Sequence, residues 1–356
     1  MLVPVNRAAA AGVHLSIPSP DLAWSGFSIG PLTIHTYALC LMAGIAAAVW
    51  LTSRRLTARG GPPEAVLDIA MWAVPFGIVG ARIYHVLTHL GNYADDPLSV
   101  LYIWEGGIAI LGSLIGGTIG AAIGCRRAGV RLLSFADALA PAMLLAQAIG
   151  RLGNWFNHEL YGSPTTLPWG LEIPSSNGAF PAGLPNGTLF HPLFLYEMLW
   201  NLLGIAVILL LERRLRLRWG TAFGTYLVWY GAGRVWLELL RIDPTSVTPL
   251  GLPANVWGAL AAVVTGATLI AVQRRRHPEP ETSVLLPGHE PVTPDGQATA
   301  EQADVQDASD ASDASDEQAT SGQHAASGQQ AASGQQAASR QQAASSGTGT
   351  PPTANA

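Results

Sequence analysis

Seven apolar stretches, each about as long as a membrane helix, constrain this chain more than any other feature of its sequence. A helix needs about 20 mostly apolar residues to cross the hydrocarbon core of a bilayer. Only 12% of the residues are charged, whereas ordinary soluble domains have about 25%. The sequence therefore predicts an all-α integral membrane protein with seven transmembrane helices, at about residues 31–52, 66–87, 106–124, 134–151, 191–211, 220–240 and 255–273.

The arginines predict how these helices are oriented. Thirteen arginines follow the first, third, fifth and seventh stretches, whereas the opposite ends have three, Arg7, Arg151 and Arg241. Short loops that stay in the cytoplasm are enriched in basic residues. We therefore expect the N-terminus outside, the C-terminus in the cytoplasm, and a long extracytoplasmic loop at about residues 152–190 between helices four and five. That loop either caps a site or is a plain connector.

The last part of the chain has a different composition. Residues 279–356 carry 1 Arg and 11 acidic residues, and Ser-Gly-Gln-Gln-Ala-Ala units recur from about Ser321 to Ala344. A segment with almost no large apolar side chains cannot offset the entropy cost of becoming ordered. We therefore expect a seven-helix membrane domain at residues 1–278 and a disordered, low-complexity cytoplasmic tail at residues 279–356. Deleting the chain after about residue 280 should leave its activity intact.

The two cysteines argue against a fold held by disulfides, and the first twenty residues argue against a cleaved signal peptide. Cys40 and Cys125 fall in different apolar stretches, so the chain has no disulfide framework. No metal-ligand spacing occurs either. The first twenty residues have one basic residue, Arg7, and no apolar segment followed by a cleavage site. We expect the first membrane helix, rather than a cleaved signal peptide, to direct the chain to the membrane.

Ionisable residues gather toward one side of the predicted membrane domain. Arg82, Arg151 and Arg234 fall near the outer ends of their helices. Each ionisable side chain in a membrane helix costs about 2.5–3.5 kcal/mol on insertion, so each is a functional candidate. The inner half has two aspartates, Asp68 and Asp137, which capping near the starts of their helices explains. A transporter needs polar groups through both leaflets, and this pattern does not provide them.

The one-sided cluster favours a fixed site that binds an anion at the level of the lipid head groups. Arginine suits phosphate because its planar fork makes bidentate, permanently charged contacts. Simpler explanations exist for single residues. Arg234 and Glu238, at i and i+4, could neutralise each other, and Arg82 could extend alone to the interface. Tyr37 and Tyr230 could belong to the interfacial aromatic belt.

The most specific stretch is residues 150–162, which read Gly-Arg-Leu-Gly-Asn-Trp-Phe-Asn-His-Glu-Leu-Tyr-Gly. It resembles the signature of the prolipoprotein diacylglyceryl transferase family. The similarity extends over about residues 28–275 and leaves out the tail. It also covers Ile34-His35-Thr36-Tyr37, Trp104-Glu105-Gly106-Gly107, His191-Pro192, Tyr196-Glu197, and Tyr230-Gly231 through Arg234, Glu238 and Arg241.

The resemblance implies a multi-pass enzyme of the bacterial cytoplasmic membrane. Such an enzyme transfers the diacylglyceryl group of phosphatidylglycerol to the lipobox cysteine thiol of a prolipoprotein, so that a thioether forms and glycerol phosphate leaves. The implied partners are phosphatidylglycerol, lipobox peptides and membrane lipid, with no nucleic acid. No cofactor and no metal are implied. Residues 1–278 would then form the catalytic domain.

The resemblance also implies roles for single residues. Arg151 and Arg234 would hold the phosphate and the leaving group, and Tyr37 and Tyr230 would bind the head group or relay a proton. Asparagines would orient the head group, and glutamates would position the arginines. The implied catalytic residues are Arg151, Arg234, Glu159, Glu238 and Tyr230, and the implied phosphatidylglycerol-binding residues are Arg151, Asn154, Asn157, Tyr37 and Arg234.

One departure from the family pattern concerns the base that activates the thiol. Many relatives carry a histidine four residues after the glycine pair, where this chain has Leu111. His191 is the possible base by position, and Glu238 is the other candidate. The departure leaves open a non-catalytic protein on the same scaffold that binds lipid or an anion, and a transferase with a different acceptor.

Overall fold

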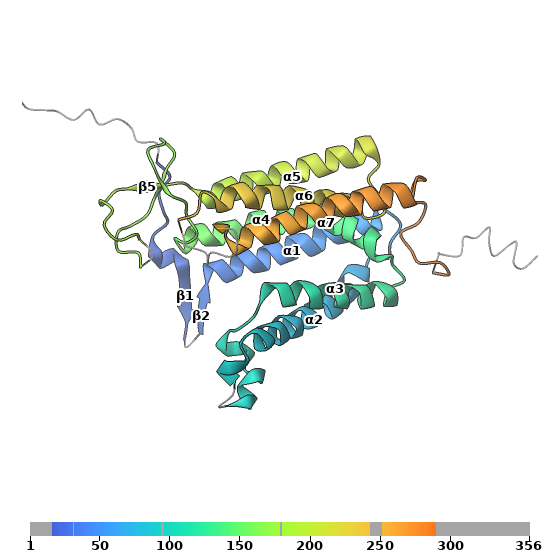
Figure 1. Ribbon diagram of the computed structural model, residues 1–356, viewed down its shortest axis with the longest axis horizontal. Helices are drawn as coiled ribbons and strands as arrows, with labels where there is room; N and C mark the ends of the chain where they lie inside the picture. Colours follow the sequence, from blue (N-terminus) through green and yellow to red (C-terminus); the bar gives the residue numbers. More distant parts are fainter. Residues whose placement is uncertain (1–15, 31, 94–95, 179, 243–250, 290–356) are drawn as a thin grey trace, which may run out of the picture. The chain divides into compact units, whose positions relative to one another are not determined.

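The computed structural model describes residues 16–30, 32–93, 96–178, 180–242 and 251–289, and these residues are mostly helical (Figure 1). The number of helices in this part of the chain is the predicted seven. Their bounds are α1 Thr36–Thr57, α2 Ala65–Thr88, α3 Ile110–Arg127, α4 Leu132–Phe156, α5 Leu193–Leu215, α6 Thr221–Glu238 and α7 Ala254–Arg276. Short 3-10 turns lie at Leu22–Ser25, Leu90–Tyr93, Pro97–Leu101 and Ile103–Glu105.

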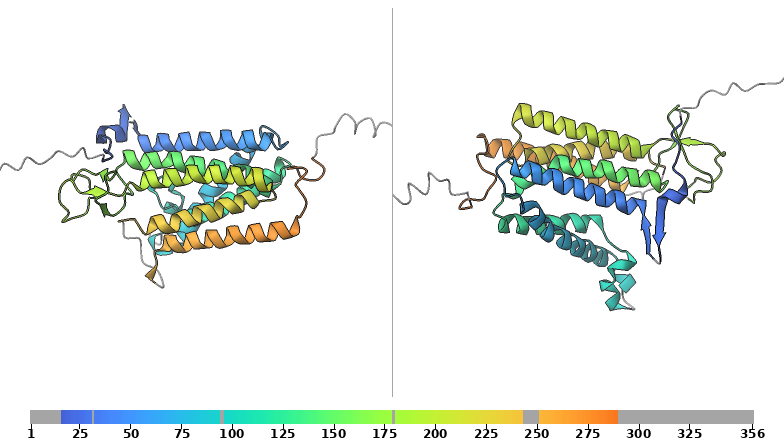
Figure 2. Two further views of the ribbon diagram at one scale, coloured as in Figure 1. Left: turned by 90° about the horizontal axis from the view of Figure 1, so that it is seen from above. Right: turned by 180° about the vertical axis from the view of Figure 1, so that it is seen from behind.

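The helices pack mainly in pairs, with α4 in the middle. α1 lies along α4, α2 along α3, and α6 along α7, while α5 and α6 both contact α4 (Figure 2). In its most apolar window α4 has 56% of its residues buried, against 11% to 33% in the other four helices of comparable hydropathy. Of these five helices, α4 is therefore the one most enclosed by the rest of the protein.

Five of the seven helices, α1, α2, α4, α5 and α7, are long and apolar enough to cross a membrane. The other two are shorter. α3 and α6 have 18 residues each. α3 is rich in glycine, and α6 contains Arg234 and Glu238, which lowers its hydropathy. The chain is therefore a multi-pass membrane protein, while the crossing of all seven helices and their orientation remain predictions.

Two small antiparallel sheets correct the prediction that the chain is entirely helical. β1 (Gly26–Ile29) pairs with β2 (Leu32–His35), where the first membrane helix was predicted to begin at residue 31. Gly30 has a φ of 61°, a conformation that suits a tight hairpin turn. The second sheet lies in the loop between α4 and α5. Its strands are β3 (Pro164–Thr165), β5 (Leu189–Phe190) and β4 (Leu171–Glu172), in that order.

The third helix also begins later than predicted. Residue 106 was the expected start, but Gly106 and Gly107 have φ values of 92° and 71°. A left-handed backbone cannot continue an α-helix, and only glycine adopts it at little cost. α3 therefore begins at Ile110, and the glycine pair belongs to the loop that connects it to α2.

Glycines bring the backbones of α2 and α3 into direct contact. A Cβ built on Gly116 would overlap the carbonyl oxygen of Phe76 and lie 3.1 Å from the Cα of Gly80. Small residues at such crossings allow close packing of membrane helices, which is driven by van der Waals contact. The same arrangement joins α6 to α7, where a Cβ on Gly266 would meet the carbonyl oxygen of Gly224.

This close packing predicts different effects for two neighbouring substitutions. We expect Gly116→Ala to cost about 1–3 kcal/mol of stability, because the added methyl group displaces backbone atoms of α2. Gly117→Ala is the matched control, since the nearest atom to its Cβ would be 3.7 Å away. Thermal unfolding of the purified protein measures both effects. Equal midpoints for the two variants would contradict the importance of this contact.

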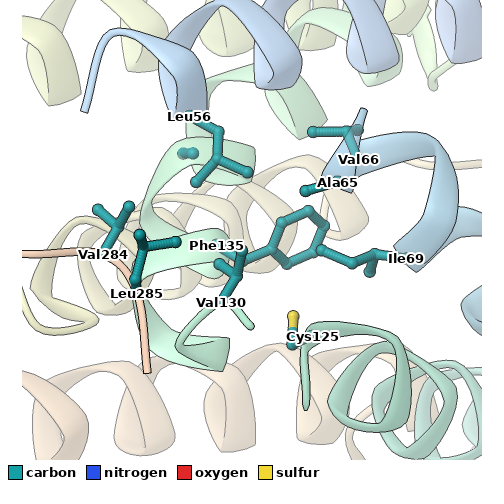
Figure 3. Packing of buried hydrophobic residues seen from close by; sticks show 10 residues of the cluster. Leu56, Ala65, Val66, Ile69, Cys125, Val130, Phe135, Val284 and Leu285 are labelled. Atoms are coloured by element: carbon teal, nitrogen blue, oxygen red, sulfur yellow. The ribbon is translucent and has the colours of Figure 1, made fainter. Parts of the chain in front are cut away.

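A cluster of buried hydrophobic residues lies where α1 ends and α2 begins (Figure 3). Leu56, Ile69 and Phe135 come from three helices, whereas Val284 and Leu285 come from the segment after α7. The backbone of residues 129–131 pairs with that segment. Arg131 N donates to Val284 O at 2.9 Å, and Leu286 N donates to Gly129 O at 2.7 Å.

The predicted boundary of the tail must therefore be moved. The prediction assigned residues 279–356 to a disordered tail, but residues 279–289 contact the helices through Val284 and Leu285, which are 3% and 5% exposed. The low-complexity repeats contain no large apolar side chains of this kind. The remaining part of the predicted tail, residues 290–356, lies outside the described residues.

Buried charges near the same end tie four helices together. Glu212 of α5 pairs with Arg55 of α1 and with Arg59, which follows the end of α1, at 2.7 and 2.5 Å. Asp137 of α4 was expected to cap its own helix, but its carboxylate accepts hydrogen bonds from Gly220 N and Phe223 N, both at 2.8 Å. These donors are free amides at the start of α6, so Asp137 caps a neighbouring helix.

Candidate functional site

The end of α4 carries the first group of site residues. The helix continues through Arg151 and Asn154, and the guanidinium of Arg151 donates to the side-chain oxygen of Asn154 at 3.2 Å. Residues at i and i+3 face the same side of a helix. The signature stretch therefore presents these two side chains together.

A tight turn after α4 brings Glu159 back to the helix. His158 and Leu160 have φ values of 54° and 56°, and Glu159 N donates to Asn154 O at 3.1 Å. The Glu159 carboxylate accepts from Asn154 Nδ2 at 2.9 Å and from Asn157 Nδ2 at 3.4 Å. Backbone strain of this kind occurs where the surroundings fix a functional geometry. The turn connects both asparagines to one carboxylate.

Glu197 in the first turns of α5 joins the two predicted phosphate-binding arginines. Its carboxylate forms an ion pair with Arg151 Nε, and its other oxygen lies 3.5 Å from Arg234 Nη1. Arg151 comes from α4 and Arg234 from α6. One buried carboxylate therefore holds guanidinium groups from two different helices next to each other.

The charge network continues along α6 to α7. Arg234 Nη2 pairs with Glu238 at 2.8 Å, and Arg241 Nη1 lies 3.8 Å from the same Glu238 oxygen. Asn255, near the start of α7, donates to the other oxygen of Glu238 at 2.9 Å. Contacts between side chains thus run from Glu159 on one side to Asn255 on the other and join α4, α5, α6 and α7.

Charge in this network is balanced. The network contains three arginines, Arg151, Arg234 and Arg241, and three glutamates, of which Glu197 and Glu238 pair directly with the arginines and Glu159 is linked to Arg151 through Asn154. Burying charged groups is costly unless they are paired, which explains why the acids accompany the arginines. The side chains of Arg151 and Arg234 remain 25% and 16% exposed, so neither is fully covered by the protein.

The two predicted tyrosines have different neighbours near this network. Tyr37 packs against α4, because a Cβ on Gly153 would lie 2.6 Å from its ring. Tyr230 lies one helical turn before Arg234 and stacks on Tyr226, with ring centroids 6.0 Å apart. The hydroxyl of Tyr226 accepts from Gln147 Nε2 at 3.0 Å. Gln147 lies one turn before Arg151, so polar groups continue below the arginines.

The possible base His191 belongs to an adjacent aromatic group. Its Nδ1 lies 3.3 Å from the hydroxyl of Tyr196, which also accepts from Trp169 Nε1 at 3.0 Å. Tyr196 is the neighbour of Glu197 in sequence. Among the contacts of the described residues, His191 has no direct bond to the arginine network. Within the residues that the structure describes, His, Cys, Asp and Glu side chains form no group of three or more that could hold a metal ion.

Arg82 does not have the role that its position in the sequence suggested. Its guanidinium donates to the carbonyl oxygens of Ser99, Val100, Gly106 and Gly107, at 2.6 to 3.1 Å. These four bonds use all three nitrogens, and the residue is 8% exposed. Arg82 therefore holds the loop between α2 and α3 and does not extend alone to the interface. Leu111, which follows that loop, is 52% exposed.

Comparison with known proteins gives a consistent result. The sequence profile of the family described as prolipoprotein diacylglyceryl transferase matches residues 25–272. A phosphatidylglycerol–prolipoprotein diacylglyceryl transferase of Leifsonia xyli subsp. xyli is 54% identical over 303 residues, which cover 82% of this chain and 91% of the relative. The protein of the same name from Paenarthrobacter aurescens is 49% identical, covering 73% of this chain and 84% of its own.

A further relative is found in Streptomyces coelicolor. It is named phosphatidylglycerol–prolipoprotein diacylglyceryl transferase 2 and is 46% identical over 275 residues, covering 76% of this chain and 85% of its own length. The matched region of the profile includes α1 through most of α7. All the residues of the charge network therefore lie inside the matched region.

Proposed function

Because this chain belongs to the prolipoprotein diacylglyceryl transferase family, we propose that the network around Glu197 is its active site. The chain is an enzyme and carries out the family's reaction, the transfer of a diacylglyceryl group from phosphatidylglycerol to a prolipoprotein. In the proposed mechanism, Arg151 and Arg234 bind the phosphate of the lipid. The acceptor is the cysteine thiol of a lipobox peptide.

The reaction requires that negative charge be stabilised on a phosphate. A base takes the proton of the cysteine thiol, and the thiolate sulfur forms a bond to a glyceryl carbon. The bond between that carbon and the phosphate oxygen breaks, and its electron pair stays on the leaving glycerol phosphate. Donors that are already in position for the developing charge lower the barrier most. Guanidinium groups suit this task because they remain charged and contact two oxygens at once.

The observation that carries the proposal is the position of Glu197 between two arginines of different helices. Arg151 and Arg234 both contact its carboxylate. The negative charge of Glu197 offsets the repulsion between the two guanidinium groups, so they are held close together. A phosphate that enters there contacts both. The partial exposure of the two side chains supports access from one side.

The other residues of the network have supporting roles in this proposal. Asn154 and Asn157 orient the head group while Glu159 fixes their amides, and Glu238 positions Arg234. Tyr37 and Tyr230 bind the head group or relay a proton. His191 remains the candidate base, since it lies beside Tyr196, next to Glu197 in sequence.

The cellular setting follows from the same premise. We propose that the enzyme resides in the bacterial cytoplasmic membrane with this site facing outward, because the arginine-rich helix ends are expected in the cytoplasm. The helical part of the chain forms the catalytic domain. The membrane supplies the lipid substrate, and the lipobox peptide reaches the site from the outer side.

A transfer assay tests the proposal directly. Purified protein in phosphatidylglycerol vesicles is incubated with a lipobox peptide, and mass spectrometry detects the diacylglyceryl adduct on cysteine. We expect the adduct with the cysteine peptide and none with a serine peptide. Absence of the adduct from folded protein would indicate a scaffold that binds lipid without transferring it.

Glu197 provides a more specific prediction. We expect Glu197→Gln to slow transfer by about 10²-fold, the effect of misplacing reacting groups by about 1 Å, because both arginines lose the carboxylate that holds them. Initial rates in the vesicle assay measure this loss. Glu64→Gln, the same substitution at an exposed position before α2, should retain the wild-type rate. A Glu197→Gln rate close to wild type would remove Glu197 from the machinery.

A further inference from the structure

We propose that a pocket at the arginine-rich end of the helices binds the phosphate group of an anionic phospholipid. The pocket has a volume of about 400 Å³ and is lined by the end of α5, the start of α6, the end of α7 and the segment that follows α7. It lies at the opposite ends of α5 and α6 from Glu197 and Arg234. It is therefore separate from the proposed active site and does not depend on it.

The charged residues that line the pocket are mostly basic. Among the described residues that line it, Arg216, Arg218 and Arg274 are arginines and Glu279 is the one acidic residue. The nearby carboxylate of Glu212 lies 3.8 Å from Arg218, but Arg55 and Arg59 already hold it at shorter distances. The pocket thus retains excess positive charge, and a phosphate would supply the missing counter-ion.

The loop that forms one wall has a strained backbone. Arg216 and Trp219 have φ values of 50° and 59°, which cost about 1–3 kcal/mol each in residues other than glycine. The indole of Trp219 donates to Glu279 O at 3.2 Å and stacks on His277, with ring centroids 4.2 Å apart. These contacts connect the loop to the segment after α7, and both form walls of the pocket.

The position of the pocket favours a lipid over a free anion. It lies at the ends of α5 and α7, two helices long and apolar enough to cross a membrane, and such ends are at the level of the lipid head groups. Leu215, which also lines it, is 56% exposed and gives the pocket an apolar edge beside which an acyl chain can pack. Basic pockets between membrane helices recognise anionic head groups in this way.

A comparison of two double variants tests the proposal. Arg216→Gln with Arg274→Gln removes two charges from the pocket, whereas Arg213→Gln with Arg275→Gln removes two exposed charges from the same helix ends outside it. Native mass spectrometry measures how many phosphatidylglycerol molecules the full chain retains and with what affinity. We expect the first variant to lose one bound lipid, with affinity reduced about tenfold or more, and the second to match the wild type.

Two further ligands separate the alternatives. Phosphatidylcholine, whose head group has no net charge, should not occupy the pocket. Inorganic phosphate is the second ligand. If it bound the wild type but not the Arg216 and Arg274 variant, and both proteins retained phosphatidylglycerol equally, the pocket would be a site for free phosphate and the lipid proposal would be overturned. Equal loss of lipid from both double variants would reduce the effect to general surface charge and also overturn the proposal. Transfer activity serves as the check that each variant is folded.

Discussion

Replacing Arg151 by alanine is expected to reduce diacylglyceryl transfer by about 10²–10³-fold, the loss that follows removal of one positioned donor to a developing negative charge. Arg151 is bonded to both Glu197 and Asn154, so it links the signature stretch of α4 to α5. Its loss removes a phosphate donor and leaves the Glu197 carboxylate with one arginine partner fewer. Initial rates of adduct formation on a lipobox peptide measure the effect.

Two controls separate chemistry from folding in this experiment. Arg126→Ala removes an exposed arginine at the end of α3 and should leave the rate unchanged. Arg151→Lys keeps the charge but not the planar fork, and should recover only part of the rate. An Arg151→Ala protein that is folded and transfers at the wild-type rate would show that the phosphate binds elsewhere.

Chains that end at different points after α7 are expected to differ strongly in stability. A chain ending at His289 should match the full-length protein, because the residues removed lack large apolar side chains. A chain ending at Pro278 loses Val284 and Leu285, which are 3% and 5% exposed, and burial of each contributes about 1.5–3 kcal/mol. It also loses the backbone pairing with residues 129–131. We expect a much lower thermal unfolding midpoint and faster inactivation.

Thermal unfolding and transfer rates of the two shortened chains measure this difference. Val284→Ala with Leu285→Ala in the full-length protein is a matched test, since it removes the buried side chains and keeps the segment. It should be intermediate between the two truncations. If the chain ending at Pro278 were as stable as the longer one, the contacts of residues 279–289 would be incidental, and the original boundary at residue 278 would stand.

Hydropathy was sufficient to predict the helices but not their starts. A run of apolar residues is visible whether or not its first residues are helical, so the first and third helices were predicted to begin at residues 31 and 106 rather than 36 and 110. Gly30 and the pair Gly106-Gly107 indicated that these helices begin later, because glycine favours the left-handed conformations found there. Short strands inside a proline-rich loop leave no periodic signal at all.

Some contacts of the candidate site could likewise be predicted from the sequence, and others could not. Arg151, Asn154 and Glu159 are close in sequence, so their contacts could be expected from one helix end and the turn after it. The link through Glu197 depends on how α4, α5 and α6 pack, which no local pattern determines. Glu197 appeared only as part of the family resemblance, and Asn255 was missed, since an asparagine near a helix start has simpler explanations. Arg82 was misjudged because its carbonyl partners belong to an irregular loop.

The glycine contacts between α2 and α3 have a mechanical consequence. Backbones that touch without intervening side chains cannot slide or rotate independently, since there are no rotamers to absorb a displacement. Arg82 ties the connecting loop at one end of this pair, and Ile69 and Cys125 join the buried cluster at the other. The two helices therefore move as one rigid unit. A displacement of the loop is transmitted along both helices to the buried cluster that includes Val284 and Leu285.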